Sequence, residues 1–418
     1  MNVKKSIVRP GRTIKEQTKT QIPVSGLKVG MYIAELDRPW LDTPFILQGF
    51  TISSVNEIET IAEYCEFVYI EDKEDAWLKA EERTLSSTPT PRVKQHKNSV
   101  SNKQEYARAA SIHGTARELT RGFMDDVRLG RGINIKEVKA SVSECVSSIL
   151  RNPDAIMWMS RIRDKDEYTM EHSLNVGLLA ISFGRHLGFA EEDLNKLGLA
   201  GMLHDVGKMR TPNEVLNKEG QLSRDEFSIM QSHAQHGRDI LVSHKDIYHG
   251  AVDVAYSHHE ALDGTGYPRK LKASGITEFT RVVTLCDVYD AITSERVYKA
   301  GRSSLDALKV LYQNKGTKFD KNLVDQYIGN IGLYPPGSIV ELRNGLVGIV
   351  INTNYRHRHL PKVLVLRDEA KMPRPEKVLN LEVSAKNNDK EHMIKTVIPN
   401  GSHGIRIEKH IKNGLTID

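Results

Sequence analysis

The chain has 418 residues, of which 39% are hydrophobic and 27% are charged, so it can bury a core and is too apolar to be disordered throughout. No run of about 18 apolar residues is present, which excludes a membrane-spanning helix, and the N-terminus lacks the apolar stretch of a secretory signal. The three cysteines lie far apart and form no CxxC pair, which predicts a protein of the reducing cytoplasm.

The net charge of +5 comes from a basic arm at residues 1–20. This arm holds six Lys or Arg residues and one Glu, so the rest of the chain is electrically balanced. We interpret the arm as a solvated tail, and the balanced remainder predicts that nucleic acid is not a partner.

Residues 1–82 are predicted to form a small α+β regulatory domain that includes the basic arm. Alternating apolar residues and turn signals predict three strands, and helical spacing predicts one helix. The strands are expected at 21–25, 30–34 and 65–70, and the helix at 54–66. Residues 83–103 are rich in Ser, Thr, Pro, Lys and Asn, which is typical of a linker.

Residues 104–334 are predicted to be helical, because apolar residues recur there at three- and four-residue steps. Residues 335–418 are predicted to form a β-rich extension, which opens with a hairpin at Asn344-Gly345 between two apolar runs. The predicted fold class is therefore mainly α. It combines a helical bundle with a small N-terminal α+β domain and a short β-rich C-terminal tail.

A series of His and Asp residues at core-facing positions is the informative feature of the helical region. It comprises His172, His204, Asp205, His233, His258, His259 and Asp287. A single buried His is usually held by ordinary hydrogen bonds. Burying so many polar groups without partners, however, would cost on the order of 2 kcal/mol each.

A shared metal site would remove that cost. Neutral imidazole suits iron, zinc, copper or nickel, and carboxylates suit harder ions such as manganese. A bridging carboxylate would allow two ions to lie about 3.5–4 Å apart.

Three segments carry a resemblance to a known family: HDVGK at 204–208, HHEALDGTGYP at 258–268, and RVVTLCDVYDAITSERVY at 281–298. Together they resemble the HD-GYP family, metal-dependent phosphodiesterases that hydrolyse cyclic di-GMP and form a branch of the HD-domain superfamily. The resemblance implies an HD-domain fold for the helical bundle. The segment LDRPWLDTPF at 36–45 also resembles the domain that often precedes HD-GYP in bacterial signalling proteins.

The resemblance implies two divalent ions, iron or manganese. One ion would be held by His172, His204, Asp205 and Asp287. The other would be held by His233, His258 and His259, with Asp205 bridging. A hydroxide between the ions would attack the phosphorus in line, which makes His204, Asp205 and Lys208 the predicted catalytic residues.

Four residues are expected to bind the substrate by the same resemblance: Lys208, Tyr267, Arg296 and Lys299. Lys208 would contact a phosphate as a point charge. Partners implied are a cyclic dinucleotide and, through the GYP turn, diguanylate cyclase domains; a homodimer is a further expectation.

The number of ions depends on a departure from the family pattern. Some members use a Glu four residues before the first His for a third ion, and Tyr168 stands there in this chain. An ordinary phenol, with a pKa near 10, is a poor substitute for a carboxylate. We therefore expect two ions and slower onward conversion to GMP.

The leading hypothesis is a cytoplasmic phosphodiesterase that opens cyclic di-GMP to pGpG, with onward hydrolysis to GMP left open. Alternatives are a 3′,3′-cyclic GMP-AMP phosphodiesterase, a non-catalytic cyclic-dinucleotide receptor, and a (p)ppGpp hydrolase of the wider HD group. Intact His204 and Asp205 favour catalysis over a receptor. His233 and the His258–His259 pair disfavour a minimal HD hydrolase.

Overall fold

The computed structural model describes residues 20–29, 31–38, 50–52, 55–71, 96–160, 168–294, 301–352, 354, 357, 359–407 and 410. The chain divides into two compact units, Met1–Thr90 and Pro91–Asp418. The first 19 residues of the predicted basic arm, most of the predicted linker, and the predicted substrate residues Arg296 and Lys299 lie outside the described residues.

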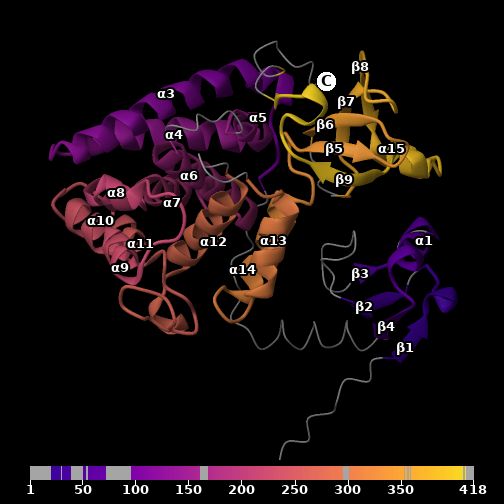
Figure 1. The fold of residues 1–418 in the computed structure, drawn as a ribbon, viewed down its shortest axis with the longest axis horizontal. Helices are drawn as coiled ribbons and strands as arrows, with labels where there is room; N and C mark the ends of the chain where they lie inside the picture. Colours follow the sequence, from indigo (N-terminus) through magenta and orange to yellow (C-terminus); the bar gives the residue numbers. More distant parts are fainter. Residues whose placement is uncertain are drawn as a thin grey trace, which may run out of the picture. The chain divides into compact units, whose positions relative to one another are not determined.

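The N-terminal unit is a small antiparallel sheet with one helix against it (Figure 1). Its elements are β1 (Thr20–Pro23), η1 (Val24–Gly26), β2 (Tyr32–Leu36), β3 (Phe50–Thr51), α1 (Val55–Tyr64) and β4 (Phe67–Glu71). The strand order is β1-β4-β2-β3. Ile33, Ile61 and Val68 are fully buried between the sheet and α1, so the apolar stripe of the helix does face the strands. The three predicted strands and the helix are present, and each of their ends lies within two residues of its expected position.

The helical region follows in the second unit, which confirms the predicted fold class (Figure 1). Its helices are α3 (Asn102–Arg128), α4 (Ile135–Arg151), α5 (Pro153–Met159), α6 (Tyr168–Leu187), α7 (Glu191–Leu203), η4 (Val206–Arg210), α8 (Asn213–Leu216), α9 (Arg224–Gln231), α10 (His233–Val242), α11 (His249–Ser257), η5 (Ala273–Gly275), α12 (Glu278–Thr293), α13 (Ser304–Gln313) and α14 (Lys321–Ile331). Side-chain caps fix several helix starts. Ser101 caps α3, and Ser223 forms a capping box with Glu226 at the start of α9.

The segment before α3 belongs with the helices by its hydrogen bonds. Ser99 N–H donates to the Arg151 carbonyl at 2.9 Å, and the Asn152 amide donates to the Val100 carbonyl at 3.0 Å. Arg185 donates to the Asn98 side chain at 2.9 Å. Residues 98–101 therefore contact α4 and α6, although their composition is typical of a linker.

The C-terminal region is a five-stranded antiparallel sheet of order β8-β7-β6-β5-β9. Its elements are β5 (Ile339–Leu342), β6 (Val347–Asn352), β7 (Lys362–Arg367), β8 (Pro373–Asn380), α15 (Leu381–Lys386), η6 (Lys390–His392), β9 (Ile394–Ile398) and η7 (Ser402–Gly404). The hairpin predicted at Asn344-Gly345 joins β5 to β6, and Gly345 has the positive φ of 88° that such a turn requires.

Each face of this sheet carries a buried apolar cluster, although the edge strand β8 is largely exposed, so the sheet is more than an appended tail. One face packs Ile349 and Leu364 against Trp158 of α5, and the indole N–H of Trp158 donates to the Ile351 carbonyl at 3.0 Å. The other face packs Val350 and its neighbours against Leu381 of α15. The sheet thus completes the core of the helical region beside α5.

Among the described residues, no helix is both long and apolar enough to cross a membrane.

Candidate metal centre

Five helical segments bring the seven predicted ligands together. His172 lies in the second turn of α6, and His204 and Asp205 directly follow α7. His233 is the first residue of α10, His258 and His259 follow α11, and Asp287 lies in the middle of α12. All except His259 are buried, and the side chain of His259 is 27% exposed.

The ligand atoms form two groups. We call His172, His204 and Asp287 the closed half, because all three are buried. We call His233, His258 and His259 the open half, because His259 reaches solvent.

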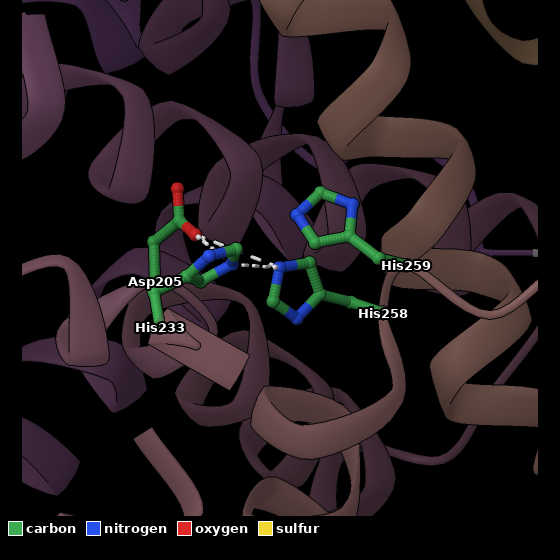
Figure 2. Close-up of side chains that lie close together, drawn as sticks. All are labelled: Asp205, His233, His258 and His259. Carbon is green, nitrogen blue, oxygen red and sulfur yellow. Dashed lines mark hydrogen bonds and ion pairs between the residues drawn. The ribbon is translucent and has the colours of Figure 1, made fainter. Parts of the chain in front are cut away.

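Asp205 lies between the two halves, and each of its oxygens faces a different one. Oδ2 lies 3.5 Å from His172 Nε2 and 3.4 Å from His204 Nε2. Oδ1 lies 3.4 Å from His233 Nε2 and 3.5 Å from His258 Nε2 (Figure 2). Each oxygen of Asp205 thus lies within 3.5 Å of two imidazoles of one half.

Asp287 faces the same space from α12. Its Oδ1 lies 3.0 Å from His172 Nε2 and 3.9 Å from His204 Nε2, and its Oδ2 lies 4.0 Å from His259 Nδ1. Two carboxylates and five imidazoles therefore converge on one buried volume.

Backbone carbonyls fix the ring orientation of three of the imidazoles. His204 Nδ1 donates to the Gly201 carbonyl at 2.8 Å, and His233 Nδ1 donates to the Met230 carbonyl at 2.6 Å. His258 Nδ1 donates to two carbonyls of α11 at 3.1 Å. Because a carbonyl only accepts, each Nδ1 carries a proton, and the Nε2 of each ring faces the centre.

Asp290 fixes the remaining ring of the closed half, and our sequence reasoning missed it. Its Oδ2 lies 2.8 Å from His172 Nδ1 and accepts a hydrogen bond from Ser294 Oγ at 2.9 Å. A signal was present, since Asp290 follows Asp287 by three residues and so shares its helix face.

The centre fits divalent cations by the chemistry of its donors. The Nε2 lone pairs of neutral His204 and His233 face the carboxylate oxygens of Asp205, so acceptors meet acceptors in a buried space. Within the described residues, His204 Nε2 and Asp205 Oδ1 are buried and have no hydrogen-bond partner. Such orphaned groups are costly unless a cation satisfies them. The two groups are consistent with a binuclear metal site.

The ionisation states of His204, His233 and Asp205 also suit metal binding. Burial would lower the pKa of His172, but Tyr168, Asp287 and Asp290 raise it well above its usual value, so an ion bound there would displace a proton. Burial lowers the pKa of His204, and it lowers the pKa of His233 to about 3, so both rings are neutral near pH 7. Burial alone would raise the pKa of Asp205, but the charge of Lys208 and the neighbouring imidazoles outweigh it and hold that pKa well below its usual range. Lys208 Nζ donates directly to Asp205 Oδ2.

Two glycines of the recognised motifs are required by close backbone approach. A Cβ on Gly207 would lie 1.9 Å from the His233 carbonyl oxygen, so η4 could not pack against α10 with any larger residue. A Cβ on Gly266 would lie 2.4 Å from the Ala261 amide nitrogen. These glycines let the two motifs fold tightly beside the open half.

The loop after His259 places Tyr267 over the open half. The Tyr267 ring stacks on the His259 ring, with centroids 4.7 Å apart and planes 28° apart. The Tyr267–Pro268 peptide bond is cis. Buried Glu260 accepts the backbone N–H groups of Arg269 at 2.6 Å and Leu271 at 2.8 Å, which ties the loop to the end of α11.

Two family models match parts of this chain, and curated proteins are similar to most or to part of it. Residues 157–323 match the HD domain family, and residues 19–138 match a domain of unknown function, DUF3391. The chain is 33% identical to cyclic di-GMP phosphodiesterase PA4108 of Pseudomonas aeruginosa, over 86% of this chain and 88% of that protein. It is 35% identical to 3′3′-cGAMP-specific phosphodiesterase 3 of Vibrio cholerae, over 37% of this chain and 34% of that protein. Among solved structures, the HDGYP protein Bd1817 of Bdellovibrio bacteriovorus matches 74% of this chain and 98% of its own, with a TM-score of 0.46 and 17% identity.

Proposed function

Because this chain belongs to the HD-GYP branch of the HD-domain phosphodiesterases, we propose that it hydrolyses cyclic di-GMP to pGpG at a binuclear metal centre. Similarity to the P. aeruginosa cyclic di-GMP phosphodiesterase extends over 86% of the chain, well beyond the HD domain itself. We expect onward hydrolysis of pGpG to GMP to be slower.

The observation that carries the proposal is the position of Asp205. Its two oxygens face imidazoles of different halves at 3.4–3.5 Å, as a bridging carboxylate requires. We assign His172, His204 and Asp287 to one ion, and His233, His258 and His259 to the other. Two divalent ions bound there would supply an activated water and neutralise charge on the phosphate.

The chain's own residues would position the substrate at this centre. Lys208 is held at Asp205 with a side chain that is 19% exposed, so its ammonium group can meet a phosphate oxygen as a point charge. Tyr267 covers His259 and would line the pocket. Arg296 and Lys299 remain proposed substrate contacts on the strength of the sequence resemblance.

We propose two ions, iron or manganese, rather than three. Tyr168 occupies the position four residues before His172, and its ring lies parallel to the His172 imidazole, with centroids 5.7 Å apart. An aromatic ring packed flat on the first ligand takes the place in which some family members carry a carboxylate.

Cyclic GMP-AMP is the second candidate substrate. The V. cholerae relatives that are specific for it are similar to less than half of this chain, which ranks cyclic di-GMP first. A non-catalytic receptor is disfavoured, because both halves of the centre have all of their proposed ligands.

Several finer assignments belong to the same proposal. We place the protein in the cytoplasm, with the N-terminal α+β domain (1–82) regulating the catalytic domain (104–334) through the linker 83–103, and with residues 335–418 as the C-terminal extension. Diguanylate cyclase domains would dock at the turn formed by residues 266–268, and a homodimer is a further candidate assembly.

The test is product analysis with metal-loaded full-length protein. Protein purified without oxygen and loaded with Fe²⁺ or Mn²⁺ should convert cyclic di-GMP to pGpG, as measured by chromatography, faster than it converts 3′,3′-cyclic GMP-AMP. Binding of cyclic di-GMP without turnover in loaded protein would favour a receptor instead.

A further inference from the structure

The open half of the centre continues outward as a run of aromatic rings. The Tyr267 ring stacks on His259, and the Phe227 ring of α9 meets Tyr267 with centroids 6.4 Å apart and planes 76° apart. The Tyr267 ring also lies edge-on to the ligand His233 at 6.4 Å. The run therefore begins at two ligands of the open half and ends at Phe227, which is 49% exposed.

Phe227 lies on a helix whose side chains all remain at least partly exposed. None of the eight residues of α9 is buried, and Ile229 on the same helix is 41% exposed. A large aromatic side chain left in water forgoes the stabilisation that burial would give. Apolar surface beside a catalytic centre is typical of a ligand-binding wall.

The start of α9 is anchored, so Phe227 is presented on a fixed backbone. Ser223 N–H donates to Glu226 Oε2 at 2.7 Å, and the Ser223 hydroxyl accepts the Glu226 N–H in return. Lys218 Nζ reaches both oxygens of Glu226, at 2.7 and 2.6 Å. Phe227 N–H donates to the Ser223 carbonyl at 2.8 Å. Helix capping rather than side-chain burial thus determines where the ring lies.

We propose that Phe227 is a stacking platform for one base of the cyclic dinucleotide, which rests on the function proposed above. A substrate whose phosphate lies at the centre carries its bases outward, and the aromatic run extends from the centre to an exposed side chain. Because Tyr267 meets Phe227 at a steep angle, the Tyr267 ring does not cover the face of the Phe227 ring. A flat purine could stack on that face.

The chemistry of the ring restricts what this platform can do. Phenylalanine has no hydrogen-bonding group, and stacking tolerates any base because every base has a π-face. Phe227 therefore contributes to affinity for cyclic dinucleotides as a class and does not distinguish guanine from adenine.

The experiment compares Phe227→Ala, Phe227→Leu and Phe227→Trp in the metal-loaded full-length protein. Ile229→Ala is the matched control, because it removes a similarly exposed apolar side chain from another face of α9. The substrates are cyclic di-GMP, 3′,3′-cyclic GMP-AMP, and methyl p-nitrophenyl phosphate, a diester without a nucleobase.

Phe227→Ala should raise KM roughly tenfold for both dinucleotides, the scale expected for one lost base–aromatic stack. Its kcat and its hydrolysis of methyl p-nitrophenyl phosphate should be unchanged. Phe227→Trp should keep KM near that of the wild-type protein, whereas Phe227→Leu should raise KM as Phe227→Ala does.

Three results would overturn the inference: a KM equal to that of Ile229→Ala, a matching loss on the diester without a base, or an effect confined to one dinucleotide. Wild-type protein that cleaves the simple diester but neither dinucleotide would overturn the proposed function. In that case the dissociation constant of cyclic di-GMP tests the stacking platform by itself. A higher dissociation constant in Phe227→Ala supports the platform, and an unchanged one contradicts it.

Discussion

The two halves of the metal centre are built differently. In the closed half, His172 is held by Asp290 and faces Asp287 at 3.0 Å, and every ligand is buried. In the open half, His259 is partly exposed and its ring is covered by Tyr267. The closed half is thus suited to retaining an ion, whereas the open half is suited to receiving a substrate. The predictions below test this division of labour.

The largest effect is expected where the halves meet. Asp205→Ala removes the carboxylate that faces both groups, so it should release most bound metal and reduce hydrolysis to background, as measured by metal analysis and product formation. Asp239→Ala is the control, because it removes an exposed carboxylate of α10 that is paired with Arg238. Full metal content in Asp205→Ala would show that Asp205 bridges nothing.

Asp290→Ala should affect the closed half selectively. Without Asp290, the His172 ring loses the acceptor that orients it, and such outer partners are typically worth about 10- to 100-fold in metal affinity or activity. Metal titration should show a lower affinity for one ion and an unchanged affinity for the other. Ser294→Ala leaves the carboxylate in place and should have a smaller effect. Equal weakening of both ions would contradict the division.

Lys208→Ala should leave both ions bound but slow the reaction. A charge-assisted hydrogen bond to a phosphate is worth about 1.5–3 kcal/mol, which corresponds to a fall of roughly 10- to 150-fold in kcat/KM. Arg210→Ala is the control, since Arg210 is an exposed cation two residues further along the chain. Unchanged kinetics in Lys208→Ala would remove this lysine from the substrate site.

The smallest effect on catalysis is expected from removing the N-terminal unit. Protein beginning at Pro91 should keep its metal and its activity, because all proposed ligands follow residue 170.

Protein beginning at Gln104 should have a lower Tm than protein beginning at Pro91, because it loses the backbone and side-chain hydrogen bonds of residues 98–101, each worth about 1 kcal/mol. Inactivity of a folded Pro91 protein would show that the N-terminal unit completes the site.

Much of this centre could be predicted from the sequence, because its residues occur in compact motifs on strongly periodic helices. Asp290 was also accessible by helix periodicity, since it lies in the segment 281–298 one turn after Asp287. Strand β3 was not predicted, since two residues are too short to show alternation. The exposure of Phe227 could not be foreseen, because an apolar residue on a short helix is more often buried.

The docking of the C-terminal sheet could not be predicted for a different reason. It depends on contacts between segments far apart in the chain, such as the Trp158–Ile351 hydrogen bond across 193 residues. Alternation within each strand identifies the sheet, but it does not identify the helix against which the sheet packs.

That contact also has a consequence for how the protein is made. Every proposed metal ligand leaves the ribosome before the first residue of β5. The apolar surface around Trp158, in contrast, is covered only by strands that are synthesised last. A nascent chain therefore passes through a stage with a complete ligand set and a bare apolar patch, which is the kind of species that chaperones bind and that aggregates. A chain ending at residue 334 would remain at that stage. Early termination should thus lower the amount of protein through aggregation or degradation, although every proposed metal ligand is present.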